Sequence, residues 1–236
     1  MLFAANRLQV TENMTIQAAI FDFDELLINL QPQHHAAERA ALAALGYDYD
    51  ALPPALLANQ TGRRISEIWE DIRAHHGLTQ PVDVLLAARQ RHFLAALRDA
   101  PALPAMPGAI EAITLLADAG YPLAITTSGI REYIDLVLAR LNVADRFRLI
   151  VTGADVTHGK PDPEPYRVTA ARLGIAPAAC VVFEDAAIGV ASAKGAGMRC
   201  IAVRNPDAET PQDLSAADLV LPSLHDFILA ILARWE

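Results

Sequence analysis

The sequence predicts an α/β protein whose core is a parallel sheet covered by helices on both faces, with an all-helical segment inserted after the first strand. From residue 16 onward, short apolar segments alternate with amphipathic segments of helical spacing, which is typical of a parallel sheet. Several apolar segments end in polar residues, as expected where ligands bind at the carboxyl ends of such strands. Residues 31–103 carry helical spacing alone, which predicts the insertion.

Six apolar runs are expected to form the strands of the sheet. The first, residues 16–23, ends in acids and indicates a buried strand. The second, residues 121–129, runs into a loop rich in hydroxyl groups. The remaining strands are expected at residues 147–153, 180–185, 199–203 and 219–221.

Five amphipathic segments are expected to form the helices that cover the sheet. The segment 107–120 has a proline at its start and a glycine at its end, which are helix start and stop signals. The segment 163–174 likewise ends in a glycine. The other helices are expected at residues 131–141, 187–197 and 225–235.

Residues 31–103 are expected to form a separate helical cap. Helical spacing covers residues 33–46, 63–77 and 81–97, and prolines flank the block on both sides. We therefore expect a discontinuous, Rossmann-like three-layer core of residues 15–30 and 104–236. Residues 1–14 precede the first strand signal and are expected to be a poorly ordered extension.

Composition excludes several classes of partner. The chain has 53% hydrophobic residues, which is enough to bury a core. Its formal net charge is −9, and this negative charge would repel the phosphate backbone of nucleic acid. Its apolar runs are too short to span a membrane, and we expect no membrane association. Its two cysteines lie in apolar runs, which fits a reduced, cytoplasmic setting. We expect a monomer, with a weak homodimer as the alternative.

Acidic residues follow two of the predicted strands. Asp22 and Asp24 lie two apart at the end of the first strand, so both side chains would point the same way in an extended segment. Glu184 and Asp185 end the strand at 180–185. Such carboxylates can hold a divalent cation or act as a nucleophile with an acid/base partner. A helix cap at Asp185 and a solvated turn at Asp22 and Asp24 are the alternatives.

Two further loops carry groups that suit a phosphate. Thr126, Thr127 and Ser128 end an apolar strand with hydroxyls and backbone N–H groups, which also suit an ordinary turn. Lys160, one of only two lysines, lies in a proline-rich loop at residues 159–163. A fixed ammonium there could neutralise a carboxylate and a phosphoryl oxygen, although a solvated loop lysine would give the same pattern.

These motifs, in this order, resemble the haloacid dehalogenase (HAD) superfamily of phosphohydrolases, in the branch with a helical cap after the first strand. The resemblance covers about residues 17–230 and rests on four segments. They are DFDELL, ITTS, GKPDPEPY and FEDAAIGVASAKGAGM, in chain order.

The resemblance implies a role for each matching residue. Asp22 would be the nucleophile that forms an aspartyl-phosphate, and Asp24 the general acid and then the base. Thr126 would donate a hydrogen bond to the transferring phosphoryl group, helped by the Thr127 N–H. Lys160 would bridge the nucleophile and the phosphate.

The resemblance also implies a magnesium cofactor. The Asp22 carboxylate, the Asp24 carbonyl and Asp185 would hold Mg²⁺, with Glu184 as a further candidate ligand. A hard, oxygen-ligated cation together with Lys160 would offset the repulsion between an anionic nucleophile and an anionic phosphate. The implied enzyme is an Mg²⁺-dependent phosphatase of a small phosphorylated metabolite, such as a sugar or polyol phosphate.

The chain departs from the family pattern near the first motif. Glu25 stands where capped members often have glycine, and Asn29 and Leu30 stand where Asp and Ser or Thr are frequent. These changes keep open a catalytically silent module that binds a phosphorylated metabolite. Residues 31–103 contain no lysine, which disfavours but does not exclude a beta-phosphoglucomutase-like mutase.

The cap should determine which phosphate ester enters. Arg63 and Arg64 follow a glycine between predicted cap helices and resemble the specificity loop of sugar-phosphate phosphatases, so we expect either one to bind substrate. His34 opens the first cap helix beside the hinge and is expected to face the cleft. A solvated helix start would explain the same residues.

Overall fold

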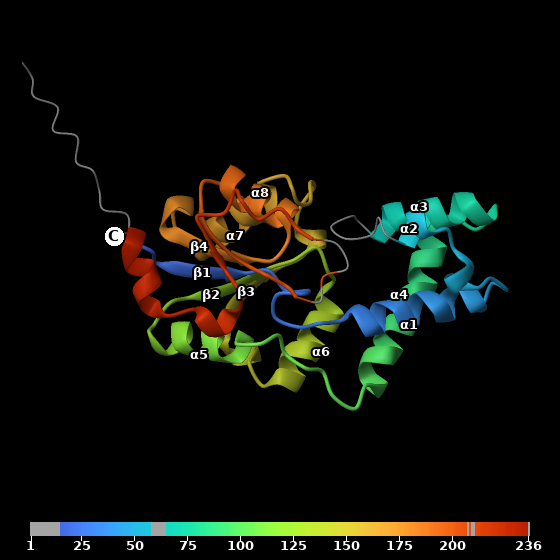
Figure 1. Ribbon diagram of the computed structural model, residues 1–236, viewed down its shortest axis with the longest axis horizontal. Helices are drawn as coiled ribbons and strands as arrows, with labels where there is room; N and C mark the ends of the chain where they lie inside the picture. The colour runs from blue at the N-terminus through green and yellow to red at the C-terminus, as the bar shows by residue number, and fades with distance from the viewer. Residues whose placement is uncertain (1–14, 58–64, 207, 209–210, 236) are drawn as a thin grey trace, which may run out of the picture.

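The computed structural model describes residues 15–57, 65–206, 208 and 211–235, and its core is a six-stranded parallel sheet (Figure 1). The strand order is β3-β2-β1-β4-β5-β6. The strands are β1 (Ala18–Phe21), β2 (Leu123–Thr126), β3 (Phe147–Val151), β4 (Cys180–Glu184), β5 (Arg199–Val203) and β6 (Leu219–Leu221). The predicted α/β class is confirmed. Each predicted strand is present: β5 and β6 have the predicted bounds, and β1 to β4 are slightly shorter than predicted.

Helices cover both faces of the sheet, as the alternating pattern predicted. They are α5 (Ala109–Asp118), α6 (Arg131–Leu141), α7 (Glu164–Leu173) and α8 (Ala187–Gly195). Figure 1 shows α5 and α6 on one face and α7 and α8 on the other. Neighbouring residues of β1 serve opposite faces: Ala19 and Phe21 pack on the side of α5 and α6, and Ala18 and Ile20 on the side of α7 and α8.

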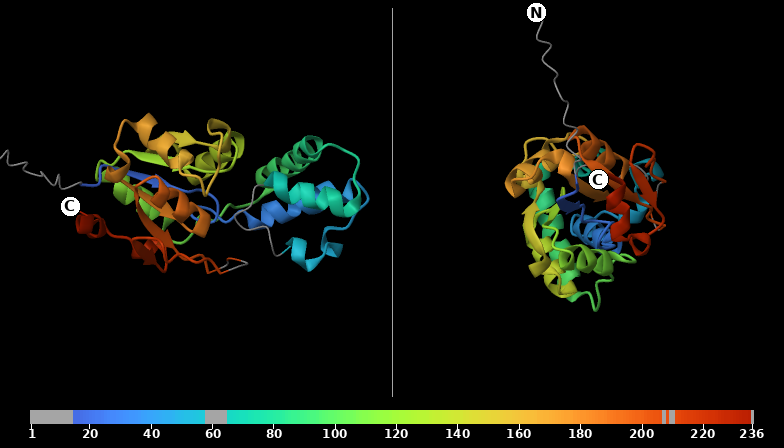
Figure 2. Two further views of the ribbon diagram at one scale, coloured as in Figure 1. Left: turned by 90° about the horizontal axis from the view of Figure 1, so that it is seen from above. Right: turned by 90° about the vertical axis from the view of Figure 1, so that its left-hand side faces the viewer.

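The segment between β1 and α5 is helical. It contains α1 (Gln31–Ala43), α2 (Pro54–Leu57), α3 (Ile65–His76) and α4 (Val82–Asp99). The views in Figures 1 and 2 agree that these helices stand beside the sheet rather than on it, next to the ends of its strands. Besides the apolar clusters on the two faces of the sheet, a separate apolar cluster lies within this helical segment. Its members include Leu42, Trp69, Ile72 and Leu85.

Two local features differ from the sequence expectations. Residues 225–235 form 3₁₀ turns, at Leu224–Asp226 and Leu229–Trp235, and not an α-helix. The Ser223 hydroxyl accepts from the backbone N–H of His225 and starts the first turn. Phe227 and Leu232 are buried in the core, whereas Ile228 is exposed. In the cap, α2 and a 3₁₀ turn at Tyr49–Ala51 were not expected.

Strand register determines where the polar motifs lie. Phe21 of β1 pairs with Ile125 of β2 and with Phe183 of β4. The residues that follow these three strands therefore meet at one edge of the sheet. No helix in the described part of the chain combines the length and apolarity needed to cross a membrane.

Candidate active site

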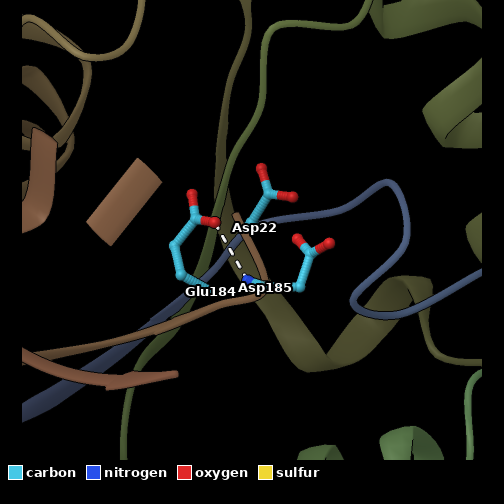
Figure 3. Close-up of side chains that lie close together, drawn as sticks. All are labelled: Asp22, Glu184 and Asp185. Atoms are coloured by element: carbon cyan, nitrogen blue, oxygen red, sulfur yellow. Dashed lines mark hydrogen bonds between the residues drawn. The ribbon is translucent and has the colours of Figure 1, made fainter. Parts of the chain in front are cut away.

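Three carboxylates meet at the carboxyl edge of the sheet. Asp22 follows β1, Glu184 ends β4 and Asp185 comes next along the chain. One ligand atom from each lies within 4.8 Å of the other two. Figure 3 shows the three carboxylates side by side, with Glu184 folded back toward the backbone nitrogen of Asp185. The convergence that the strand pattern implied is present.

Lys160 lies between two of these carboxylates. It comes from the loop between β3 and α7, and its Nζ lies 2.5 Å from Asp22 Oδ1 and 2.5 Å from Glu184 Oε1. Its side chain is only 6% exposed. Burial alone would lower the pKa of Lys160, but the two carboxylates raise it above its usual value. The residue is therefore a fixed, permanent cation in the site.

Glu184 is held by four hydrogen-bond donors. Its Oε1 accepts from Lys160 and from the Tyr166 hydroxyl, at 2.7 Å for the latter. Its Oε2 accepts from the backbone N–H groups of Asp185 and Ala186, at 3.0 and 3.2 Å. With both oxygens engaged, Glu184 supports Lys160 and the turn that carries Asp185.

A glycine in α8 makes room for this carboxylate. A Cβ atom added at Gly189 would lie 1.7 Å from Glu184 Oε1. Any side chain at position 189 would therefore displace Glu184. This contact gives a physical reason for glycine at position 189 in the small-residue segment after Asp185.

Asp22 and Asp185 are both buried, with 9% of each residue exposed. The pKa of Asp22 is raised to about 7, mainly because the carboxyl group is buried. The positive charge of Lys160 lowers this pKa, and the negative charge of Glu184 raises it further. Burial and the nearby acids also raise the pKa of Asp185 well above its usual range. No described residue donates a hydrogen bond to the Asp185 carboxylate. Buried, hard oxygen donors with surplus negative charge are the donor set that Mg²⁺ takes, so these residues fit that ion.

Asp24 has two unlike oxygens. Its Oδ2 accepts a hydrogen bond from the Tyr133 hydroxyl at 2.5 Å. Its Oδ1 is buried and has no hydrogen-bond partner within the described ranges. Burial raises the pKa of Asp24, while the Tyr133 hydrogen bond and the charge of Lys160 oppose that rise. Tyr133, a residue of α6, was not singled out from the sequence.

The structure separates Thr126 from the other predicted catalytic residues. Its side chain is fully buried, and its hydroxyl lies 2.6 Å from the Thr169 hydroxyl on α7. Because neighbouring residues of a strand face opposite ways, Thr127 takes the side of Asp24, whose pKa its hydroxyl helps to lower. Thr127 Oγ1 also accepts from the Gly129 N–H, and Ser128 is exposed beside it.

The described cap residues bring an arginine beside His34. His34 stacks on Phe93 with ring centroids 4.3 Å apart, and its Nδ1 lies 2.6 Å from Arg89 Nη2. Arg89 is 5% exposed, and its Nη2 lies 3.4 Å from Glu38 Oε1. Burial and the Arg89 charge lower the pKa of His34 well below its usual value.

Sequence reasoning missed Arg89, although its spacing carried a signal. It lies four residues after Leu85 and four before Phe93, both buried, on the same face of α4. A cation within an apolar stripe of a helix is expected to be buried and paired. Arg63 and Arg64, which were expected to bind substrate, lie outside the described residues, as does the expected extension at residues 1–14.

The unusual first motif has a specific local structure. Glu25 adopts a left-handed backbone conformation with φ of 65°, which glycine adopts without strain. Its Oε2 accepts from the Asn205 side chain at 2.9 Å, which links the turn after β1 to the loop after β5. Asn29 accepts from the Gln31 N–H at the start of α1.

Comparisons with known proteins agree with this geometry. A model of haloacid dehalogenase-like hydrolases matches residues 19–203. Validoxylamine A 7'-phosphate phosphatase from Streptomyces hygroscopicus subsp. limoneus is 34% identical over 209 residues, which cover 88% of this chain and 94% of that protein. Hexitol phosphatase B from Escherichia coli strain K12 is 32% identical over 216 residues, which cover 89% and 93%.

A solved structure extends the likeness to three dimensions. CbbY from Rhodobacter sphaeroides in complex with xylulose-(1,5)bisphosphate matches with a TM-score of 0.79 and 26% sequence identity. The match covers 92% of this chain and 99% of that one. The likeness therefore includes both the sheet and the helices beside it.

Proposed function

This chain belongs to the haloacid dehalogenase-like hydrolase family, and on that premise we propose that it is a magnesium-dependent phosphatase of a small phosphorylated sugar or polyol. Relatives named as phosphatases of a validoxylamine phosphate and of hexitol phosphates support this substrate class. The observation that carries the proposal is the Lys160 ammonium between Asp22 and Glu184, beside Asp185.

Asp22 is the proposed nucleophile. Its carboxylate oxygen forms a bond to phosphorus, and the bond from phosphorus to the ester oxygen breaks. Lys160, 2.5 Å from Asp22, stabilises the negative charge of the attacking carboxylate and of the phosphoryl oxygens. The product of this step is an aspartyl-phosphate and a free alcohol.

Asp24 is the proposed general acid and base. Its protonated form gives a proton to the departing ester oxygen, and burial favours that form by raising its pKa. The resulting carboxylate then takes a proton from water, whose oxygen attacks phosphorus and breaks the bond to Asp22. Free phosphate leaves, and both aspartates return to their starting states.

Mg²⁺ is the proposed cofactor, held by the carboxylates of Asp22 and Asp185 and the carbonyl of Asp24. When bound, the ion supplies positive charge next to the transferring phosphoryl group. Glu184 has both oxygens engaged by donors within the protein, so we assign it the support of Lys160 and Asp185.

The loop after β2 is the proposed phosphoryl-binding loop. Thr127 replaces Thr126 in this role, since the Thr126 hydroxyl contacts Thr169 inside the protein. Ser128 is exposed at the same strand end and adds a second hydroxyl. The cap is proposed to choose the alcohol part of the ester, with His34 and the arginines at positions 63 and 64 as candidates.

The test is a phosphate-release assay with Mg²⁺ on hexitol phosphates, pentose and hexose phosphates, a pentulose bisphosphate, phosphoglycolate and nucleotides. We expect release from sugar or polyol phosphates, loss of activity with a chelator, and loss in Asp22→Asn. Conversion of a sugar phosphate to its isomer without phosphate release would establish a mutase instead. Equal background rates for the native chain and Asp22→Asn would leave only a binding module.

A further inference from the structure

The contact between Tyr133 and Asp24 carries an inference that rests on the proposed function. We propose that Tyr133 is a positioning residue, which holds one oxygen of Asp24 so that the other oxygen gives and takes the proton. Tyr133 Oη lies 2.5 Å from Asp24 Oδ2. Asp24 Oδ1 is left as the carboxyl oxygen without a hydrogen-bond partner among the described residues.

Three separate segments of the chain fix the position of the Tyr133 hydroxyl. The side chain comes from α6 and is 4% exposed. Its ring makes an edge contact with Phe93 of α4, with centroids 5.3 Å apart, and a tilted contact with Phe23 at 6.0 Å. The ring is therefore fixed from the cap side and from the core side at once.

Gly129 in the loop after β2 leaves room for the hydroxyl itself. A Cβ atom at position 129 would lie 1.8 Å from Tyr133 Oη. The hydroxyl thus occupies a space that this glycine keeps open, and the contact with Asp24 depends on it. Ring carbons of Tyr133 would also lie within 2.8 Å of that Cβ atom, so the glycine makes room for the ring edge and the hydroxyl together. The hydrogen bond to Asp24 is the feature that a packing role for the ring would not need.

The orientation of Asp24 matters for proton transfer to the leaving ester oxygen, because a carboxyl group that rotates freely points its proton away from that oxygen part of the time. Holding Oδ2 restricts that rotation and presents Oδ1. The benefit applies only to esters whose leaving oxygen needs a proton. Alkyl phosphates need one, whereas p-nitrophenyl phosphate releases a stable phenolate without it.

The experiment compares kcat/KM for p-nitrophenyl phosphate and for the fastest alkyl phosphate of the screen above. Tyr133→Phe keeps the ring and deletes the hydroxyl. We expect kcat/KM to fall by about 10-fold or more for the alkyl ester and by less than about threefold for the aryl ester. Using kcat/KM confines the comparison to steps up to release of the alcohol.

Tyr166→Phe is the matched control, since it deletes the other buried tyrosine hydroxyl that donates to a carboxylate of the site. It touches Glu184 and not Asp24, so we expect it to lower kcat/KM for both esters by the same factor. Should Tyr133→Phe fail to fold, Gly129→Ala keeps the tyrosine in the sequence and pushes its hydroxyl and ring edge away from Asp24, and we expect the same difference between esters.

Equal losses on the two esters in Tyr133→Phe, or no loss, would overturn the inference while leaving the phosphatase assignment intact. The same difference between esters in Tyr166→Phe would also overturn it. Absence of phosphate release by the native chain from every ester would instead refute the proposed function.

Discussion

The amine of Lys160 lies 2.5 Å from a carboxylate oxygen of Asp22, although 138 residues separate them in the chain. The same amine contacts Glu184 at 2.5 Å. The loop that carries Lys160 is thereby attached to two neighbouring strands of the sheet, β1 and β4. One side chain thus serves both the stability of this edge and its proposed chemistry.

Replacing Lys160 by methionine should affect activity and stability together. The variant leaves Asp22 and Glu184 buried without their cation, so we expect a loss of about 3 kcal/mol in the free energy of unfolding. We also expect at least a 100-fold loss of kcat, on the order expected for removing a group that stabilises transition-state charge. Urea unfolding and phosphate release measure the two effects.

The other lysine provides the control for this substitution. Lys194 pairs with Asp218 at 2.6 Å, and about a third of its side chain is exposed. Lys194→Met should cost less than about 1 kcal/mol and leave kcat unchanged. Similar losses in the two variants would contradict a special place for Lys160.

The raised pKa of Asp22 predicts how the stability of the metal-free protein depends on pH. The folded protein binds the proton of this carboxyl more tightly than the unfolded chain, because the pKa is about 7 instead of 3.8. The resulting stabilisation is complete below pH 3.8 and is lost as pH rises through 7. Asp22→Asn should show a smaller decline, because only the contributions of the other buried acids with raised pKa values, Asp24 and Asp185, remain. Urea unfolding from pH 4 to 8 would measure the difference. Parallel curves for the native chain and the variant would refute it.

The same protons should compete with Mg²⁺. Metal ligands must be deprotonated, and the pKa values of Asp22 and Asp185 are both raised. We therefore expect Mg²⁺ to raise the melting temperature more at pH 8 than at pH 5.5, with proton release on binding near neutral pH. Calorimetry in two buffers of different ionisation enthalpy counts the protons. A pH-independent effect of Mg²⁺ would count against these two residues as ligands.

Two glycines of α8 should respond in opposite ways to alanine. At Gly189 the added Cβ would collide with Glu184 Oε1 at 1.7 Å, so we expect a loss of about 1–3 kcal/mol in the free energy of unfolding and at least a 10-fold loss of kcat. At Gly195 the nearest atom, on Pro163, would lie 3.4 Å away. Gly195→Ala should keep activity and gain about 0.5–1 kcal/mol, since alanine favours the helix. Equal activities of the two variants would argue against the role of Glu184.

The buried pair of Arg89 and Glu38 predicts a coupling within the cap. Arg89→Met should destabilise the protein by about 3 kcal/mol, because it leaves the Glu38 carboxylate buried without a cation. Adding Glu38→Gln should recover most of that loss. Urea unfolding of both single variants and the double variant measures the coupling, and simple additivity of the two losses would disprove it.

The sequence was sufficient to predict which strand ends meet. Asp22, Glu184 and Asp185 lie at the ends of apolar runs, and parallel strands bring such positions to one edge. That rule needs no knowledge of side-chain contacts and brings the carboxylates together. Lys160 lies in a loop after a strand, and its contact with Asp22 was expected from the resemblance to the HAD superfamily.

It was harder to predict which of two neighbouring residues points toward the site, and which helix residues make contacts near it. Thr126 and Thr127 carry the same hydroxyl, and the choice between them depends on which residue ends β2, a boundary that composition cannot locate to one position. Tyr133 reaches Asp24, and Arg89 reaches His34, through packing that involves α6 and α4. Their sequence patterns resemble those of ordinary helix residues.

The order of strands in the sheet also has a consequence for biosynthesis. β1 is a central strand, but its two partners, β2 and β4, begin only at Leu123 and Cys180. At about 5–20 residues per second, a ribosome needs roughly 8–30 s after β1 emerges before β4 is complete. Until β2 is made, both edges of this apolar strand stay unpaired, and the edge that pairs with β4 stays unpaired for the whole interval. The nascent chain should therefore depend on chaperone protection.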